Sequence, residues 1–306
     1  MLIRSRTKGI SPGRPTLEGS VAVRDGRRLS FAEHGSPSGP AIIWFHGTPG
    51  SRRQIPLDAR DYAVANGIRV IGVDRPGIGS STPHQYANVA EFPADIALLA
   101  DALGIDTFRV IGLSGGGPYA LACGALLPNR VVGVGVLGGV APTVGPDAID
   151  GGLVEVAAKW LAPLVAHGRV PLGIALTFAI RMVKPFAGAG LDLYAAVQPP
   201  GDKDLLSRPE FKAMFLDDLL NGSRFQITAP LADALLFARD WGFRLDDVKV
   251  PVRWWHGDDD HIVPFRHGDH CVSRLPNATL SVIDGESHLG GLGIARAVID
   301  ELIGLK

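Results

Sequence analysis

The chain has 306 residues, of which 46% are hydrophobic, and its formal net charge is -1. These values predict a large buried core and exclude the excess of positive charge that binding to nucleic acid requires. Two cysteines are too few for a disulfide framework, so we expect small buried thiols in a reducing compartment and hence a cytoplasmic protein.

The N-terminal half is expected to alternate between strands and helices. Residues 1–20 are predicted to be a basic tail without the apolar stretch of a secretory signal, and residues 21–33 an antiparallel hairpin with Asp25-Gly26 at its turn. The next strands are predicted at 41–45, 69–73, 108–113 and 131–137, and the helices near 53–66, 91–103 and 118–127. This alternation predicts a mostly parallel sheet with helices on both faces.

The alternation stops between about residues 142 and 243. This stretch is apolar, helical in character and repeatedly interrupted by proline, and strands resume only at Val250. Within it, residues 161–183 approach the ~20 apolar residues that a membrane span needs, but Arg169 and Pro171 argue against a span. We expect this segment to cover the core and to line an apolar pocket; a helix lying on a membrane surface is the alternative.

The sequence Gly112-Leu113-Ser114-Gly115-Gly116 follows a predicted strand and precedes a predicted helix. A G-x-S-x-G turn in this setting bends the backbone sharply, and side chains in place of its glycines would collide with the neighbouring strand and helix. The serine hydroxyl then stands exposed above the sheet. The pattern predicts that Ser114 is a nucleophile, and a glycine-rich phosphate-binding turn is the alternative.

A nucleophilic serine needs an imidazole that takes its proton and a carboxylate that orients the imidazole. Two strands predicted after the apolar stretch supply both groups. Asp260 follows the strand at 250–256, and His288 follows the strand at 278–283. Because Ser114, Asp260 and His288 each come just after the carboxyl end of a predicted strand, we expect them to meet at one edge of the sheet.

From about Val21 to Leu305 the chain resembles the α/β-hydrolase superfamily, in its capped esterase and proline-iminopeptidase-like branch. Its order of serine, aspartate and histidine is that of the superfamily. Four motifs carry the resemblance: the serine turn, His46-Gly47-Thr48-Pro49-Gly50, the strand and loop at 70–81, and Gly257-x-x-Asp260-x-x-Val263-Pro264 with His288 beyond it. The resemblance implies an α/β fold with a mostly parallel eight-stranded sheet, a core of residues 21–141 and 244–306, and a helical cap at 142–243.

The same resemblance implies roles for the loop after the strand at 41–45. The backbone N–H groups of Thr48 and Gly115 would form an oxyanion hole for the negative oxygen that appears when Ser114 attacks a carbonyl. His46 and Gly47 would support this loop.

Asp260 has two acidic neighbours that compete for its role. Asp258 and Asp259 are equally acidic, and with His261 the cluster could ligate a metal ion. Metal sites draw their ligands from separated positions rather than consecutive ones, so we expect no metal and no cofactor. Asp260 is preferred because it matches the superfamily's spacing from Gly257.

A serine in the turn suits acyl transfer to water through an acyl-enzyme. Relatives that open epoxides or displace halide carry an aspartate there, and the epoxide-opening relatives have two cap tyrosines where this segment has only Tyr194. We therefore expect an esterase that acts on a small, partly apolar molecule. The alternatives are a proline-iminopeptidase-like aminopeptidase, a carbon–carbon hydrolase, a perhydrolase and, from another class, a ligand-binding receptor with a vestigial triad.

The expected partner is a small-molecule substrate, without nucleic acid and without stable insertion into a membrane. The protein could also form a homo-oligomer, a question that the sequence does not decide.

Overall fold

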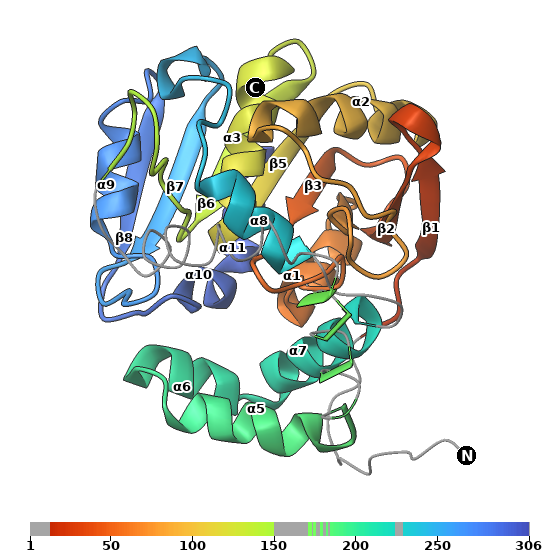
Figure 1. Cartoon of the computed structure of the whole chain (residues 1–306), viewed down its shortest axis with the longest axis vertical. Helices are drawn as coiled ribbons and strands as arrows, with labels where there is room; N and C mark the ends of the chain where they lie inside the picture. Colours follow the sequence, from red (N-terminus) through yellow and green to blue (C-terminus); the bar gives the residue numbers. More distant parts are fainter. Residues whose placement is uncertain are drawn as a thin grey trace.

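One sheet of eight strands organises the part of the chain that the structure describes. This computed structural model describes residues 13–149, 184–223 and 229–305, together with single positions between 171 and 182 (Figure 1). The strands are β1 (Leu17–Ala22), β2 (Arg28–Gly35), β3 (Ala41–Phe45), β4 (Arg69–Val73), β5 (Phe108–Leu113), β6 (Val131–Leu137), β7 (Val252–Gly257) and β8 (Ala278–Ile283).

These strands lie in the order β1-β2-β4-β3-β5-β6-β7-β8. β2 is antiparallel to both of its neighbours, β1 and β4, and every other neighbouring pair in the sheet is parallel. The predicted mostly parallel eight-stranded sheet is confirmed.

β1 and β2 form the predicted antiparallel hairpin, with Asp25 and Gly26 in its turn. Both turn residues have a positive φ, 57° and 69°, which an Asp-Gly pair adopts more readily than most. β1 begins at Leu17, however, so the tail predicted for residues 1–20 extends too far. β1 is an edge strand with mostly exposed side chains, so it lacks the alternation of apolar residues that reveals a half-buried strand.

Helices cover both faces of the sheet, as predicted. α1 (Leu57–Ala65) and α11 (Ala295–Ile303) pack on one face, and α2 (Phe92–Ala102), α3 (Gly117–Leu126) and α9 (Arg266–Val272) pack on the other. Successive side chains of a strand point to opposite faces, so Ile42 and Trp44 of β3 join the core under α1 and α11, whereas Ile43 and Phe45 join the core under α2 and α3. The central strands are therefore continuous apolar runs.

Between β6 and β7, the structure gives the bounds of four α-helices. They are α5 (Ala187–Ala196), α6 (Pro200–Ser207), α7 (Pro209–Gly222) and α8 (Ala229–Phe237). In Figure 1, α5, α6 and α7 form a group below the core, whereas α8 lies against it and contributes Leu236 and Phe237 to the core.

The apolar segment at 161–183 falls largely outside the described residues. Among the helices that are described, none combines the length and the apolar character that crossing a membrane requires.

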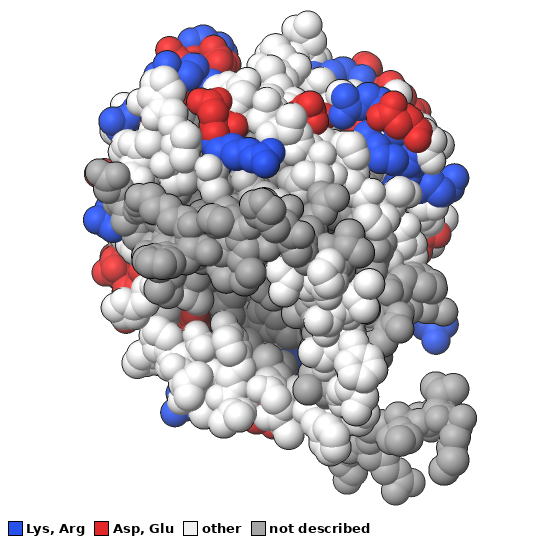
Figure 2. All heavy atoms as spheres, viewed as in Figure 1, with Lys and Arg blue, Asp and Glu red and all other residues white. Residues whose placement is uncertain are grey.

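The face drawn in Figure 2 carries both signs of charge. Lys and Arg side chains lie next to Asp and Glu side chains along its upper part.

Candidate active site

The turn after β5 holds Ser114 in a strained backbone conformation. Ser114 has a φ of 51°, in the left-handed region that side chains other than glycine rarely adopt. A Cβ atom on Gly112 would lie 2.4 Å from the carbonyl oxygen of Gly116, and one on Gly116 would lie 2.4 Å from the carbonyl oxygen of Phe45. Both positions therefore require glycine. The turn continues through the short helix η3 (Ser114–Gly116) into α3.

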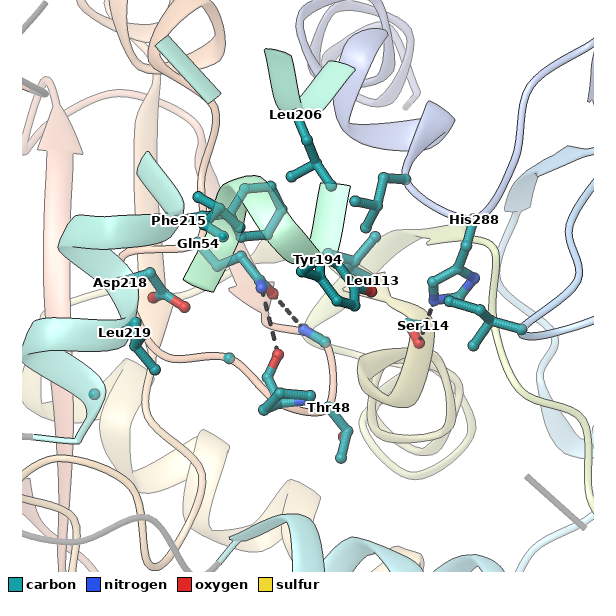
Figure 3. A pocket seen from close by; sticks show the side chains of 17 residues that line it. Thr48, Gln54, Leu113, Ser114, Tyr194, Leu206, Phe215, Asp218, Leu219 and His288 are labelled. Atoms are coloured by element: carbon teal, nitrogen blue, oxygen red, sulfur yellow. Dashed lines mark hydrogen bonds between the residues drawn. The ribbon is translucent and has the colours of Figure 1, made fainter. Parts of the chain in front are cut away.

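Ser114, His288 and Asp260 form a hydrogen-bonded chain at the carboxyl ends of β5, β8 and β7. His288 Nε2 lies 2.9 Å from Ser114 Oγ (Figure 3). His288 Nδ1 lies 2.7 Å from Asp260 Oδ2. The carboxylate can only accept, so Nδ1 donates to it and Nε2 is free to accept the serine proton. All three side chains are at most 9% exposed.

Asp260 is the acidic residue of its loop that faces His288. Its Oδ1 accepts hydrogen bonds from the backbone N–H groups of Ile262 (2.9 Å) and Val263 (2.8 Å). Burial alone would raise the pKa of Asp260, but hydrogen bonds from His256 and His288 outweigh burial and lower this pKa well below its ordinary value. The Asp260 carboxylate therefore stays ionised at neutral pH.

The two neighbouring aspartates point elsewhere. Asp258 accepts a hydrogen bond from the backbone N–H of Gly285 (2.7 Å), and Asp259 lies 3.1 Å from His261 at the surface. Within the described ranges, no group of three His, Cys, Asp or Glu side chains is arranged to hold a metal ion.

His256 is a second histidine on Asp260, and sequence reasoning missed it. Trp254 Nε1 can only donate, and it lies 3.1 Å from His256 Nδ1, so the proton of the neutral His256 ring is on Nε2. That Nε2 lies 2.8 Å from the carbonyl oxygen of Val263 and 3.3 Å from Asp260 Oδ2. His256 thus helps to orient Asp260. The available signal was the alternation along β7, which places Trp254 and His256 on the same face.

The predicted oxyanion loop follows β3 and lies against the serine turn. A Cβ atom on Gly115 would lie 2.4 Å from Thr48 Oγ1, so the two predicted donor residues are neighbours. His46 is buried beneath the loop, with Nδ1 2.7 Å from the Gly47 carbonyl and Nε2 accepting from the backbone N–H of Arg75 (3.3 Å). Burial, aided by the charge of Arg75, lowers the pKa of His46 well below its ordinary value and keeps its ring neutral.

A buried ion pair, also missed from the sequence, connects the oxyanion loop to α8. Arg75 Nη2 lies 2.7 Å from Asp233 Oδ2 and 2.8 Å from Thr48 Oγ1, and Thr48 Oγ1 donates to the same carboxylate oxygen (2.5 Å). The other oxygen of Asp233 accepts from the Tyr119 hydroxyl at 2.6 Å. Asp233 and Arg75 are 158 residues apart, so no local pattern could reveal their contact.

A cavity of about 250 Å³ opens onto Ser114, His288 and Thr48. Helices α5, α6 and α7 supply much of its wall. The apolar side chains that line it are Leu113, Leu191, Tyr194, Leu206, Phe215, Leu219, Ile262 and Leu289. Figure 3 shows Tyr194 and Leu113 beside Ser114 and His288, with Asp218 and Leu219 on the opposite side of the view.

Asp218 of α7 brings a carboxyl group to this largely apolar cavity. Its Oδ2 accepts from the backbone N–H of Ser51 at 3.0 Å, and Oδ1 accepts from the Ser51 hydroxyl. Burial raises the pKa of Asp218 to about 7, although the hydrogen bonds from Ser51 oppose the rise. The Asp218 carboxyl group is therefore protonated more easily than that of an exposed aspartate.

The chain is similar to several known proteins. Residues 40–292 match the family model of the α/β hydrolase fold. Over 88% of its length, the chain is 26% identical to a bifunctional esterase/perhydrolase of Acinetobacter calcoaceticus, 92% of which is covered. It is 34% identical to a proline iminopeptidase of Xylella fastidiosa over 38% of this chain and 37% of that protein. Its structure resembles that of an esterase from Rhodococcus sp. ECU1013, with a TM-score of 0.66 and 22% identity over 94% of this chain and 99% of the other.

Proposed function

Because the chain belongs to the α/β-hydrolase fold family, we propose that it is a serine hydrolase that cleaves a carboxylic ester, or a related acyl bond, of a small and partly apolar substrate. The observation that carries this proposal is the hydrogen-bonded chain from Ser114 through His288 to Asp260 beside an apolar cavity. The similarity to an esterase/perhydrolase over 88% of this chain supports the same class of reaction.

In the proposed mechanism Ser114 Oγ attacks the substrate carbonyl while His288 Nε2 takes the serine proton. Asp260 stabilises the imidazolium, and the N–H groups of Thr48 and Gly115 stabilise the oxyanion. The tetrahedral intermediate collapses to an acyl-enzyme as His288 returns the proton to the leaving alcohol. A water molecule, deprotonated by His288, then attacks the acyl-enzyme, and collapse of the second intermediate releases the acid and restores Ser114.

We also propose that residues 142–243 act as a cap that selects the apolar part of the substrate, since α5, α6 and α7 line the cavity at Ser114. A cytoplasmic location is part of the same proposal, because Cys123 and Cys271 are buried free thiols.

Acyl-chain length provides a test of the cap. Each methylene that enters the apolar cavity is expected to raise kcat/KM by about fourfold, from ~0.8 kcal/mol of transfer free energy, until the cavity is full. Kinetics with p-nitrophenyl acetate, butyrate, hexanoate and octanoate measure this series. Leu206→Phe, which narrows the cavity, should move the optimum to a shorter acyl chain.

Leu193→Phe is the matched control for that series, because Leu193 of α5 is 71% exposed and does not line the cavity. This variant should keep the optimum of the unmodified protein. Equal kcat/KM across the series would remove the proposed role of the cap.

The position of Asp218 favours a second candidate function, that of an aminopeptidase that binds the free amine of its substrate. Four acids of the cap could pair with an amine: Asp192, Glu210, Asp217 and Asp218. Of these, only Asp218 lines the cavity, and Asp192 is paired with Lys212 and Asp217 with Arg53. The similarity to a proline iminopeptidase over part of the chain points the same way.

Esters and aminoacyl p-nitroanilides distinguish the two candidates. Because the cavity wall is mostly apolar, we expect uncharged esters to react faster than aminoacyl anilides. The comparison is repeated with Asp218→Asn and, as a matched control, with Asp217→Asn. A preference for anilides that Asp218→Asn abolishes and Asp217→Asn preserves would move the assignment to an aminopeptidase.

A further inference from the structure

The start of cap helix α6 packs directly on the loop that carries His288. A Cβ atom on Gly201 would lie 2.9 Å from Glu286 Oε2 and 3.2 Å from the backbone nitrogen of Ser287. The next residue, Asp202, donates its backbone N–H to Ser287 Oγ at 3.3 Å. The cap therefore contacts the histidine loop through backbone as well as side chains.

The Asp202 carboxylate reaches the residue that follows His288. Its Oδ1 accepts from the backbone N–H of Leu289 at 2.7 Å, and the whole residue is 1% exposed. Its Oδ2 is buried and has no hydrogen-bond partner among the residues that the structure describes. A buried, unpaired carboxylate oxygen is costly and calls for an explanation.

The charged groups around Asp202 provide this explanation. Asp260 and Glu286 repel its negative charge, whereas His288 attracts it once the imidazole is protonated. Burial and the charge of Asp202 together raise the pKa of Tyr194 on α5. Burial raises the pKa of Asp202, and the hydrogen bond from the Leu289 N–H opposes that rise, as does the positive form of His288. The attraction between His288 and the Asp202 carboxylate is therefore strongest when the imidazole carries a proton on both nitrogens.

We propose that Asp202 is a positioning residue for His288: it holds the histidine loop through the Leu289 N–H, and its charge stabilises the imidazolium that forms during the reaction. The inference rests on the proposed hydrolase function, in which His288 takes the proton of Ser114. In this proposal the cap has two roles: it forms a wall of the cavity, and it helps to position His288.

Asp202→Asn separates the charge from the hydrogen bond, because the asparagine oxygen can still accept from Leu289. Loss of the charge should shift the titration midpoint of the His288 imidazole, followed by NMR and assigned with His288→Gln, to lower pH by about half a unit or more. The acid limb of the pH profile of kcat/KM for p-nitrophenyl butyrate should move in the same direction. Asp202→Ser serves in its place if the asparagine variant does not fold.

Asp204→Asn is the matched control. Asp204 lies on the same helix, is exposed and is paired with Arg208 at 2.7 Å, so Asp204→Asn removes an equal charge from the helix and leaves the hydrogen bond from Leu289 to Asp202 in place. We expect the midpoint to stay in place in this variant. Asp202→Ala, which also removes the acceptor for Leu289, should lower kcat several-fold with little change in KM.

The NMR titration requires no substrate, so its outcome is independent of the proposed function. If the unmodified protein hydrolyses neither esters nor anilides, the proposed function is wrong. The electrostatic coupling of Asp202 to His288 can still be measured in that case. A midpoint that Asp202→Asn leaves unchanged, or that Asp204→Asn shifts equally, would overturn the inference.

Discussion

Ser114→Ala should lower kcat for the best p-nitrophenyl ester by several orders of magnitude. In the proposed mechanism the serine oxygen forms the bond to the acyl group, and alanine offers no atom for that bond. In subtilisin, loss of the nucleophilic serine lowers kcat by about 10⁶-fold. Steady-state kinetics at saturating ester measure the loss, and circular dichroism checks that the variant is folded.

Ser114→Gly is a useful companion variant. Glycine adopts a φ of 51° without strain, so Ser114→Gly should be more stable than Ser114→Ala by about 1 kcal/mol while being equally inactive. Inactivity in both variants then cannot result from unfolding. Substantial ester hydrolysis by either variant would show that another residue performs the chemistry.

Asp260→Asn should reduce kcat by roughly 10⁴-fold, as the equivalent change does in a serine protease, while the fold is preserved. The asparagine amide can donate a hydrogen bond to His288 Nδ1, and the ring proton then lies on Nε2. Because Nε2 faces Ser114 and already carries a proton, it cannot accept the serine proton. The measurement is kcat across the pH range in which the unmodified protein is active.

Asp258→Asn and Asp259→Asn are its matched controls, because both side chains are exposed and point away from His288. We expect each to keep kcat within about twofold, as surface substitutions usually change little. If one of these changes is the damaging one, the assignment of Asp260 as the orienting carboxylate is wrong.

Much of the sheet could be predicted because buried parallel strands are apolar along their whole length. The predicted ranges 41–45, 69–73, 108–113 and 131–137 coincide with β3, β4, β5 and β6. The range 278–283 coincides with β8, although β8 is an edge strand without a buried side chain. β1 was mistaken in part for a tail because its exposed side chains carry no such pattern, and only its pairing with β2 defines it.

Some residues of the candidate site could likewise be predicted from the sequence, and others could not. Gly112 and Gly116 could be recognised because a sharp turn excludes side chains within a few residues of Ser114. Asp233 and Asp202 could not, because their partners lie 158 and 87 residues away along the chain and meet them only in the folded structure. Sequence spacing therefore identifies chemical groups near one turn, whereas the residues that orient them depend on tertiary packing.

Covalent labelling of the full chain with a fluorophosphonate tests the central proposal most directly. The reagent reacts with an activated serine, so intact mass spectrometry should reveal one adduct, and peptide mapping should place it on Ser114. Ser114→Ala should form no adduct, and His288→Gln should form it far more slowly. An adduct on a different residue, or ester hydrolysis that persists after Ser114 is replaced, would contradict the account.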